Sequence, residues 1–326
     1  MIYVSFFIGL LLICKGGDWV VDAASFIARA FGIPKYIVGA TIVSFATTMP
    51  EILVSVAAAL KGSSVMAIGN AVGSVSANTG IILGISLFCL PVAIRRKEYL
   101  TKNILYIGCL ILLFLAFQDR VFDAGDCIFL LMGGILFLVM NVKNAMTGRQ
   151  EQGRIPAGKK EFGRHIFFFL FGATCVVIGS ELLIDSACAL ARQFDISEEL
   201  ISVTILAMGT SLPEFVTTIT AVIKKESSLS VGNIVGANVI DTAFILPICT
   251  LITGESLAVA PQMAQIDLPI CILLSMIALL PMLIRGRIRR IDGASVLVIY
   301  LIYFCIITKG TRRPQAAKSP PASGGM

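Results

Sequence analysis

Thr47-Thr48-Met49-Pro50-Glu51 and its counterpart Thr210-Ser211-Leu212-Pro213-Glu214 are the two stretches that decide the fold of this chain. Each places a carboxylate, a proline and two hydroxyl side chains inside a segment that is otherwise apolar enough to lie in lipid. A charged side chain at the centre of a bilayer costs about 2.5–3.5 kcal/mol even on lenient insertion scales. Two such charges in matching positions therefore indicate the two walls of one cation site.

The composition is that of a helical membrane protein that crosses the bilayer many times. Of the 326 residues, 57% are apolar and 14% are charged, whereas soluble domains are about 25% charged. The net charge of +6 does not indicate nucleic-acid binding, because the basic residues fall in loops between apolar runs. With one histidine and nine cysteines that form no Cys-x-x-Cys pair, neither a zinc or redox centre nor a cofactor is expected.

The apolar runs predict an all-α, polytopic protein with ten transmembrane helices. They lie at roughly 2–30, 35–60, 65–90, 100–118, 122–141, 165–193, 198–224, 229–253, 266–284 and 292–309. Lys and Arg number 18 on one side of this arrangement and 7 on the other. Because basic residues concentrate in cytoplasmic loops, both termini are expected outside the cytoplasm.

The two halves of the chain repeat at a constant offset of 163 residues, and 16–83 aligns with 179–246 without a gap. The identical pairs include Asp22/Asp185, Arg29/Arg192, Thr47/Thr210, Pro50/Pro213, Glu51/Glu214, Lys61/Lys224, Gly69/Gly232, Asn70/Asn233, Gly73/Gly236 and Thr79/Thr242. Five spans per half is an odd number, so the second half enters the membrane with opposite polarity, as in secondary transporters with a midplane substrate site. We expect inverted five-helix repeats at 1–141 and 165–310, a cytoplasmic linker at 142–164 and a disordered tail at 311–326.

Each Pro-Glu stretch supplies oxygen atoms. Thr47 and Glu51 are four residues apart and share a helix face. Pro50 lacks a backbone donor, so the helix is expected to kink just before it and to free carbonyls near Ser44 to Thr47. Irregular backbone at membrane depth is tolerated only where protein or a water-filled cavity receives it.

The third and eighth spans add further polar groups. One carries Gly69-Asn70-Ala71-Val72-Gly73-Ser74 followed by Asn78, and the other carries Gly232-Asn233-Ile234-Val235-Gly236-Ala237 followed by Asp241. The predicted site combines three acids with neutral oxygens, namely Glu51, Glu214 and Asp241 with Thr47, Thr48, Ser74, Asn78, Thr210 and Ser211. Calcium takes six to eight oxygens, and no thiolate or imidazole cluster favours a softer metal.

Some of these residues also have a structural interpretation. Hydroxyls in membrane helices often bond back to the carbonyl one turn earlier, so a single Ser or Thr is not diagnostic. Asp18, Asp22, Glu181 and Asp185 are interpreted as helix-capping or packing charges rather than ligands.

The paired stretches resemble the two alpha repeats of the calcium/cation antiporter family, most closely its sodium/calcium exchanger branch of prokaryotic type. That branch is marked by Gly-Thr-Ser-Leu-Pro-Glu and Gly-Asn-x-x-Gly-Ser-Asn motifs, which 209–214 and 232–241 match closely and 46–51 and 69–78 match more loosely. The resemblance implies a central calcium site of Glu51 and Glu214 with the backbone carbonyls of Thr47 and Thr210. It implies flanking sodium sites that use Ser44, Thr48, Ser74, Ala207 and Ser211, with Asn78 and Asp241 at the middle position. It also implies that spans one and six slide across the core.

Two departures from the family pattern are visible. Ala237 stands where the family usually has a serine, so the outward-side sodium site loses one ligand. Val75 replaces a usual asparagine, which is expected to loosen packing or hydration there.

The expected function is Ca²⁺/Na⁺ antiport by alternating access, with Ca²⁺, Na⁺ and the lipid bilayer as partners and the monomer as the working unit. A proton/calcium exchanger or a potassium-dependent relative that uses the same carboxylates is the alternative. A channel would need a continuous pore, and an intramembrane protease would need a motif such as His-Glu-x-x-His, so we expect no enzyme. The large regulatory loop of eukaryotic relatives is missing between the halves, which favours a bacterial or archaeal inner or plasma membrane.

Overall fold

The computed structural model describes residues 2–90, 96–147, 158–193 and 209–311, and this part of the chain is almost entirely helical. The helices are α1 (Ile2–Phe31), α2 (Lys35–Val38), η1 (Gly39–Val43), α3 (Ser44–Thr47), α4 (Met49–Leu60), α5 (Ser64–Ala77), η2 (Asn78–Leu83), α6 (Gly84–Cys89), α7 (Arg96–Ala116), α8 (Ala124–Thr147), α9 (Lys159–Gln193), α12 (Leu212–Ile223), α13 (Ser227–Ile240), η4 (Asp241–Ile245), α14 (Leu246–Thr253), η5 (Met263–Asp267), α15 (Leu268–Arg285) and α16 (Arg290–Thr311). The four η elements are π-helices. Two short strands, β1 (Val121–Phe122) and β2 (Leu257–Ala258), complete the described elements.

Where the structure describes the chain, the helices match the predicted spans; the first part of the predicted span 198–224 and nearly all of the predicted tail 311–326 lie outside the described residues. Within the described residues, seven helices are long and apolar enough to cross a membrane, one bent pair (35–60) forms a further span, and two shorter apolar helices occupy 100–116 and 212–223. Large apolar side chains such as Leu11 (66% exposed) and Phe129 (61% exposed) point outward, as expected of a surface in contact with lipid. The protein is therefore an all-α, polytopic membrane protein, as predicted.

Two helices extend beyond the apolar runs. α8 continues to Thr147, and α9 begins at Lys159 with a charged first turn, within the segment that was predicted as a linker. Apolar composition marks only the part of a helix that lies in lipid, so it does not locate the helix ends in water.

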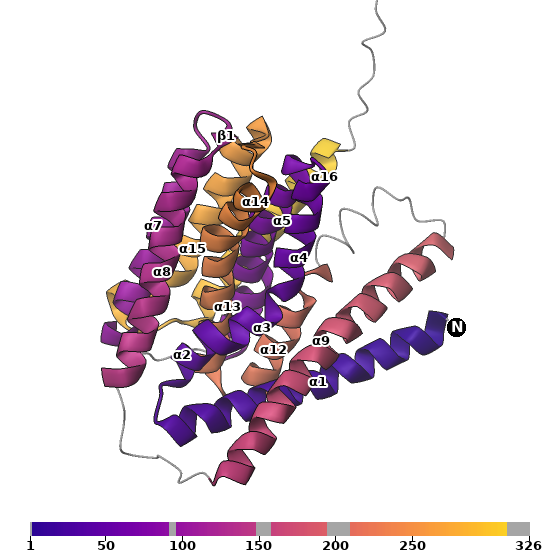
Figure 1. The fold of residues 1–326 in the computed structure, drawn as a ribbon, viewed down its shortest axis with the longest axis vertical. Helices are drawn as coiled ribbons and strands as arrows, with labels where there is room; N and C mark the ends of the chain where they lie inside the picture. The colour runs from indigo at the N-terminus through magenta and orange to yellow at the C-terminus, as the bar shows by residue number, and fades with distance from the viewer. Residues whose placement is uncertain (1, 91–95, 148–157, 194–208, 312–326) are drawn as a thin grey trace, which may run out of the picture.

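The two longest helices, α1 and α9, lie side by side and cross the rest of the bundle obliquely (Figure 1). A Cβ atom at Gly16 would lie 2.6 Å from the carbonyl oxygen of Gly172, and one at Gly179 would lie 2.9 Å from that of Gly9. Small residues at these positions allow the two backbones to approach closely. The two helices therefore pack tightly against each other as one pair.

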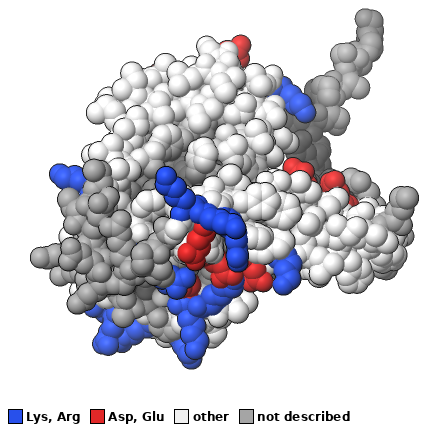
Figure 2. Space-filling view, turned by 60° about the horizontal axis from the view of Figure 1, so that its bottom comes forward, with Lys and Arg blue, Asp and Glu red and all other residues white. Residues whose placement is uncertain are grey.

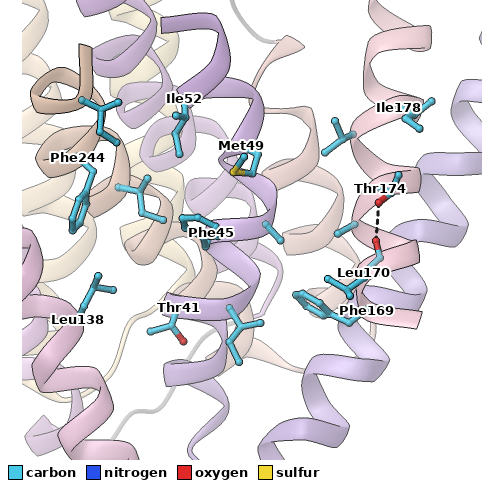
Figure 3. Close-up of a pocket in the computed structure, with 16 residues that line it drawn as sticks. Thr41, Phe45, Met49, Ile52, Leu138, Phe169, Leu170, Thr174, Ile178 and Phe244 are labelled. Atoms are coloured by element: carbon cyan, nitrogen blue, oxygen red, sulfur yellow. Dashed lines mark hydrogen bonds between the residues drawn. The ribbon is translucent and has the colours of Figure 1, made fainter. Parts of the chain in front are cut away.

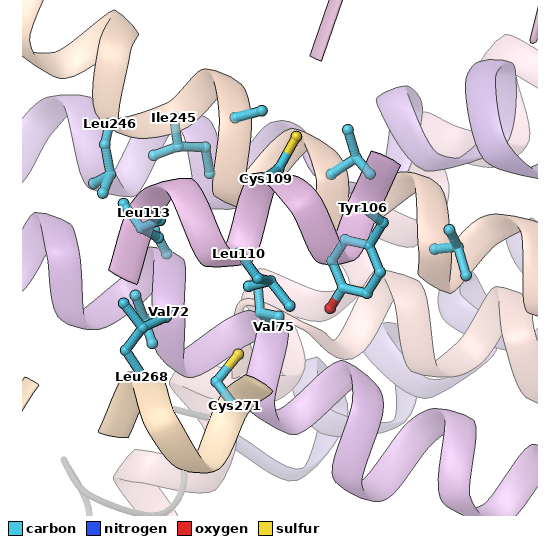
Figure 4. Close-up of a cluster of buried hydrophobic side chains, with 14 of the residues drawn as sticks. Val72, Val75, Tyr106, Cys109, Leu110, Leu113, Ile245, Leu246, Leu268 and Cys271 are labelled. Carbon is cyan, nitrogen blue, oxygen red and sulfur yellow. The ribbon is translucent and has the colours of Figure 1, made fainter. Parts of the chain in front are cut away.

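The centre of the bundle is formed by the third and eighth spans. The apolar part of 64–89 is 72% buried and that of 227–253 is 83% buried, against 33% for α1 and α9. Figure 4 shows the apolar packing around them, where Val75 of α5 meets Leu110 of α7 and Cys271 of α15. These two spans are therefore the scaffold on which the polar residues are placed.

Contacts between loops fix the ends of the bundle. β1 pairs antiparallel with β2, so the loops after α7 and after α14 meet at one end. At the other end, Lys35, at the start of α2, bonds to Glu226, between α12 and α13. The α1–α2 and α12–α13 connections therefore share one end of the bundle, which is the arrangement that an inverted second half requires.

A cavity of about 820 Å³ lies between the bent 35–60 span, α8, α9 and η4. Phe45, Met49, Phe169 and Phe244 are among the side chains that line it (Figure 3). The Thr174 hydroxyl on its wall donates back to the Leu170 carbonyl, at 2.9 Å. The space between α9 and the broken 35–60 span is therefore lined by apolar side chains and is not completely filled by them.

Candidate cation-binding site

The site begins at two breaks in the helices. At Thr48 the backbone has φ −83° and ψ 2°, and the axis bends by 45° between 35–47 and 49–60. Ser211 has nearly the same conformation, with φ −84° and ψ 8°. Pro50 and Pro213 lie in the first turn of α4 and α12, where a missing N–H costs nothing. The predicted break before Pro50 is confirmed.

Glu51 and Glu214 lie in the first turns of α4 and α12 and are completely buried. A carboxylate is stabilised there by the positive end of the helix dipole. The Thr48 hydroxyl donates to Glu214 Oε1 at 2.9 Å, so Glu214 reaches a residue of the turn that carries Glu51. The two glutamates therefore share one interior region.

Asn78 and Asp241 are the first residues of the π-helices η2 and η4. Asn78 Nδ2 donates to Asp241 Oδ2 across the two halves, at 3.5 Å. A π-turn widens the helix locally and is often found at functional sites. The widened turns begin at the two residues that meet across the halves, and the sequence pattern did not indicate these turns.

Asn70 joins its own half to the other half, although it was not among the predicted site residues. Its Nδ2 donates to Ser55 Oγ at 2.9 Å and to the Glu51 carbonyl at 3.1 Å. Its Oδ1 accepts from Thr210 Oγ1 at 3.4 Å. Asn70 therefore fixes the start of α4 and the break before α12 relative to each other.

Asn233 makes the equivalent contacts in the second half. Its Nδ2 donates to Thr217 Oγ1 at 3.0 Å and to Thr218 Oγ1 at 3.2 Å, and its Oδ1 accepts from Thr47 Oγ1 at 3.5 Å. Since Thr218 is related to Ser55 by the same offset of 163 residues, the network follows the internal repeat. The identity of Asn70 and Asn233 in the repeat was the signal that could have identified them.

Several buried oxygens in this region lack a hydrogen-bond partner. They are both Glu51 carboxylate oxygens, Glu214 Oε2, Asp241 Oδ1, Asn78 Oδ1, Ser74 Oγ and Ser211 Oγ. An unsatisfied buried polar atom costs about 1–3 kcal/mol, and more when it is charged. Hard cations take oxygen ligands, so unpaired buried oxygens of this kind are suited to cation binding.

Other predicted hydroxyls are directed elsewhere. Thr47 Oγ1 bonds back to the Val43 carbonyl at 3.2 Å, and Ser44 Oγ bonds back to the Thr41 carbonyl at 3.2 Å. Such back-bonding is common in membrane helices. The Ser44 carbonyl, which was expected to be freed, already accepts from the Thr48 N–H at 2.9 Å. Ala207 lies outside the described residues.

The departure at Val75 has a local explanation. Its counterpart in the second half, Asn238, donates to Thr79 Oγ1 at 2.8 Å and to the Tyr106 hydroxyl at 3.1 Å. Val75 instead lies in the apolar cluster of Figure 4, completely buried. The expectation of looser packing at Val75 is therefore wrong, because Val75 is an apolar side chain buried among apolar neighbours.

The acids alone do not form a metal centre. Among the described residues, no three His, Cys, Asp or Glu side chains cluster closely enough to hold a metal ion. Neutral oxygens such as those of Ser74, Ser211 and Asn78 are therefore needed to complete coordination, which fits a hard alkali or alkaline-earth cation.

A crossing helix pair, two broken helices and a buried set of acids and unpaired oxygens define an ion transporter that binds its cation within the membrane. The chain belongs to the sodium/calcium exchanger family, whose model, described as sodium/calcium exchanger protein, matches residues 1–143 and 164–309.

Relatives and solved structures agree with this assignment. The chain is 33% identical to inner membrane protein YrbG of Escherichia coli, over 83% of this chain and 85% of that protein. It is 27% identical to the sodium/calcium exchanger MaX1 of Methanosarcina acetivorans, over 94% and 99% of the two chains. Its fold superposes on the sodium-calcium exchanger NCX_Mj with a TM-score of 0.83, at 28% identity, covering 93% and 97% of the two chains.

Proposed function

We propose that this protein is a secondary active antiporter that exchanges Ca²⁺ for Na⁺ across a cell membrane by alternating access. The observation that carries the proposal is that Glu51 and Glu214, both completely buried at the starts of α4 and α12, are linked through the hydrogen bond from Thr48 to Glu214, with unpaired oxygens on both glutamates. The proposed ligands all come from one chain, which supports a functional monomer.

We assign the central position to Ca²⁺, between Glu51 and Glu214 with the carbonyls of Thr47 and Thr210. The flanking positions take Na⁺. Ser74 and Ser211 keep free hydroxyls for one of them. Two close carboxylates repel each other strongly where the effective dielectric constant is low, so the site resists closing until cations neutralise it.

The repeats define how the chain sits in the membrane. We assign 1–141 and 165–310 to inverted repeats and 142–164 to a cytoplasmic linker. Lys and Arg side chains gather at the end that carries the α12–α13 loop (Figure 2). Because cytoplasmic loops are enriched in basic residues, this end faces the cytoplasm and both termini face outward.

Calcium-45 uptake into proteoliposomes tests the function, with Na⁺, K⁺ and proton gradients imposed one at a time. An outward-directed Na⁺ gradient is expected to drive uptake, and a pH gradient alone is not. Uptake that follows the pH gradient and ignores Na⁺ would contradict Na⁺ coupling and identify a proton/calcium exchanger.

Ala237→Ser is expected to strengthen the sodium dependence. Ala237 is completely buried on α13, one turn before Asp241, and a serine adds one oxygen there. One added ligand of about 0.5–1.5 kcal/mol lowers the Na⁺ concentration for half-maximal exchange by about twofold to about tenfold. Ala243→Ser, at a buried position in the apolar cluster, is the control. An unchanged Na⁺ response in Ala237→Ser would show that position 237 does not face a sodium site.

A further inference from the structure

Lys224 ties the crossing helix α1 to the core of the bundle. Its Nζ lies 2.8 Å from Asp22 Oδ1 and 3.2 Å from Asp18 Oδ1, and it also donates to the Asp18 carbonyl at 3.1 Å. Asp18 and Asp22 lie one turn apart on α1, on one helix face, whereas Lys224 directly follows α12. None of the three belongs to the cation site.

The internal repeat places the same charges at the other end of the molecule. The offset of 163 residues relates Asp18 to Glu181, Asp22 to Asp185 and Lys224 to Lys61. The two acids lie on α9, and Lys61 directly follows α4. In the described part of the chain, no ion pair joins Lys61, Glu181 or Asp185 to another residue, and all three are exposed. Among the described residues, one set of charges is thus joined by ion pairs and the equivalent set is not.

Packing shows the same asymmetry. α1 lies against α12, where a Cβ at Gly17 would approach Val216 Cγ1 to 2.9 Å and Thr220 Oγ1 to 3.0 Å. The positions on α4 equivalent to Val216 and Thr220 are Leu53 and Ala57. Both are exposed, Leu53 by 61%. The crossing pair therefore covers α12 and leaves α4 uncovered.

We infer that Lys224 and Lys61 alternately hold the α1–α9 pair through ion pairs, Lys224 at one end of the molecule and Lys61 at the other. We call each of these two sets of ion pairs a latch. This inference rests on the proposed alternating access. In the present conformation the Lys224 latch is closed, and it holds α1 against α12 at the end assigned to the cytoplasm. Sliding of the pair breaks these contacts and brings Glu181 and Asp185 of α9 to Lys61, which closes the opposite end.

The latches suit a reversible switch because they are partly exposed. The side chains of Lys224, Asp18 and Asp22 are 27%, 45% and 63% exposed, and ion pairs in such positions are weak. Since each end can form an equivalent set, loss of one is offset by formation of the other. The free-energy difference between the two conformations is then small, so bound ions can shift the equilibrium between them.

Hydrogen–deuterium exchange of the full chain in lipid nanodiscs, without transported ions, tests the latches. Lys224→Gln is expected to raise exchange about fivefold in 212–224 and to lower it in 49–61. Lys61→Gln is expected to do the opposite, although Lys61 makes no ion pair with any residue that the structure describes. The double variant is expected to return both segments close to the wild-type rates. Lys225→Gln, in the same loop and exposed, is the control.

Opposite shifts from the two lysines distinguish a latch from a general effect on stability. If Lys224→Gln merely destabilised the fold, exchange would rise in both segments and Lys61→Gln would have no effect, and either result would overturn the inference. The measurement needs no transported ion, so it is independent of the flux assay. A protein that failed to exchange Na⁺ for Ca²⁺ could still show the opposite shifts.

Discussion

Glu51→Gln and Glu214→Gln are each expected to abolish calcium antiport while leaving the protein folded. Glutamine has nearly the same shape as glutamate but carries no charge, so a buried divalent cation loses half of its carboxylate partners. Loss of one partner from a buried ionic contact costs about 3–5 kcal/mol, which corresponds to a decrease in calcium-45 uptake of at least about 100-fold. Without Ca²⁺, both variants are expected to unfold at a temperature no lower than the wild type, because the empty site then holds one buried charge fewer.

Glu255→Gln is the matched control, because Glu255 is exposed in the loop before β2. It is expected to keep wild-type uptake. Normal calcium flux in either Glu51→Gln or Glu214→Gln would refute the shared site, because each carboxylate is proposed to be indispensable. Loss of both flux and folding would instead identify the glutamate as structural.

The features that could be predicted from the sequence are those with a large local energy cost. A proline is not tolerated in the interior of a helix, so a helix must break just before Pro50. A charged side chain such as that of Glu51 is too costly in a membrane segment without a partner. The repeat at a constant offset then extends both arguments to Pro213 and Glu214 and requires the opposite polarity of the second half. These constraints sufficed for the spans within the described residues, for the break before Pro50 and for the burial of Glu51 and Glu214.

The features that could not be predicted depend on packing between distant segments. The π-turns at Asn78 and Asp241 have backbone angles close to those of an α-helix, so the local sequence carries no clear signal for them. The directions in which the hydroxyl groups point could not be predicted from the sequence either. Ser44 and Thr47 bond to their own helix, whereas Thr48 reaches Glu214, and only the position of the other half decides between these outcomes.

Gly232→Ala is expected to destabilise the whole protein. α13 passes α2 so closely that a Cβ at Gly232 would overlap the carbonyl oxygen of Tyr36 and lie 3.0 Å from its carbonyl carbon. Backbone cannot move aside as a flexible side chain can, so overpacking of about 3 kcal/mol is expected. Thermal unfolding in detergent is expected at a clearly lower temperature, and calcium flux is expected to fall with it, because Asn233 and Asp241 lie on the segment that must shift.

Gly108→Ala distinguishes this effect from a general response to replacing glycine in a membrane helix. Among the described residues, nothing lies within 4 Å of a Cβ at Gly108 in α7, so alanine there is expected to be neutral or to stabilise the helix by up to about 1 kcal/mol. If Gly232→Ala unfolded at the wild-type temperature, α13 and α2 would not be in the close contact that aligns Asn233 with Thr47. The two glutamate variants and Gly232→Ala therefore test different things: the former remove the charge that binds the ion, and the latter separates the halves that bring the charges together.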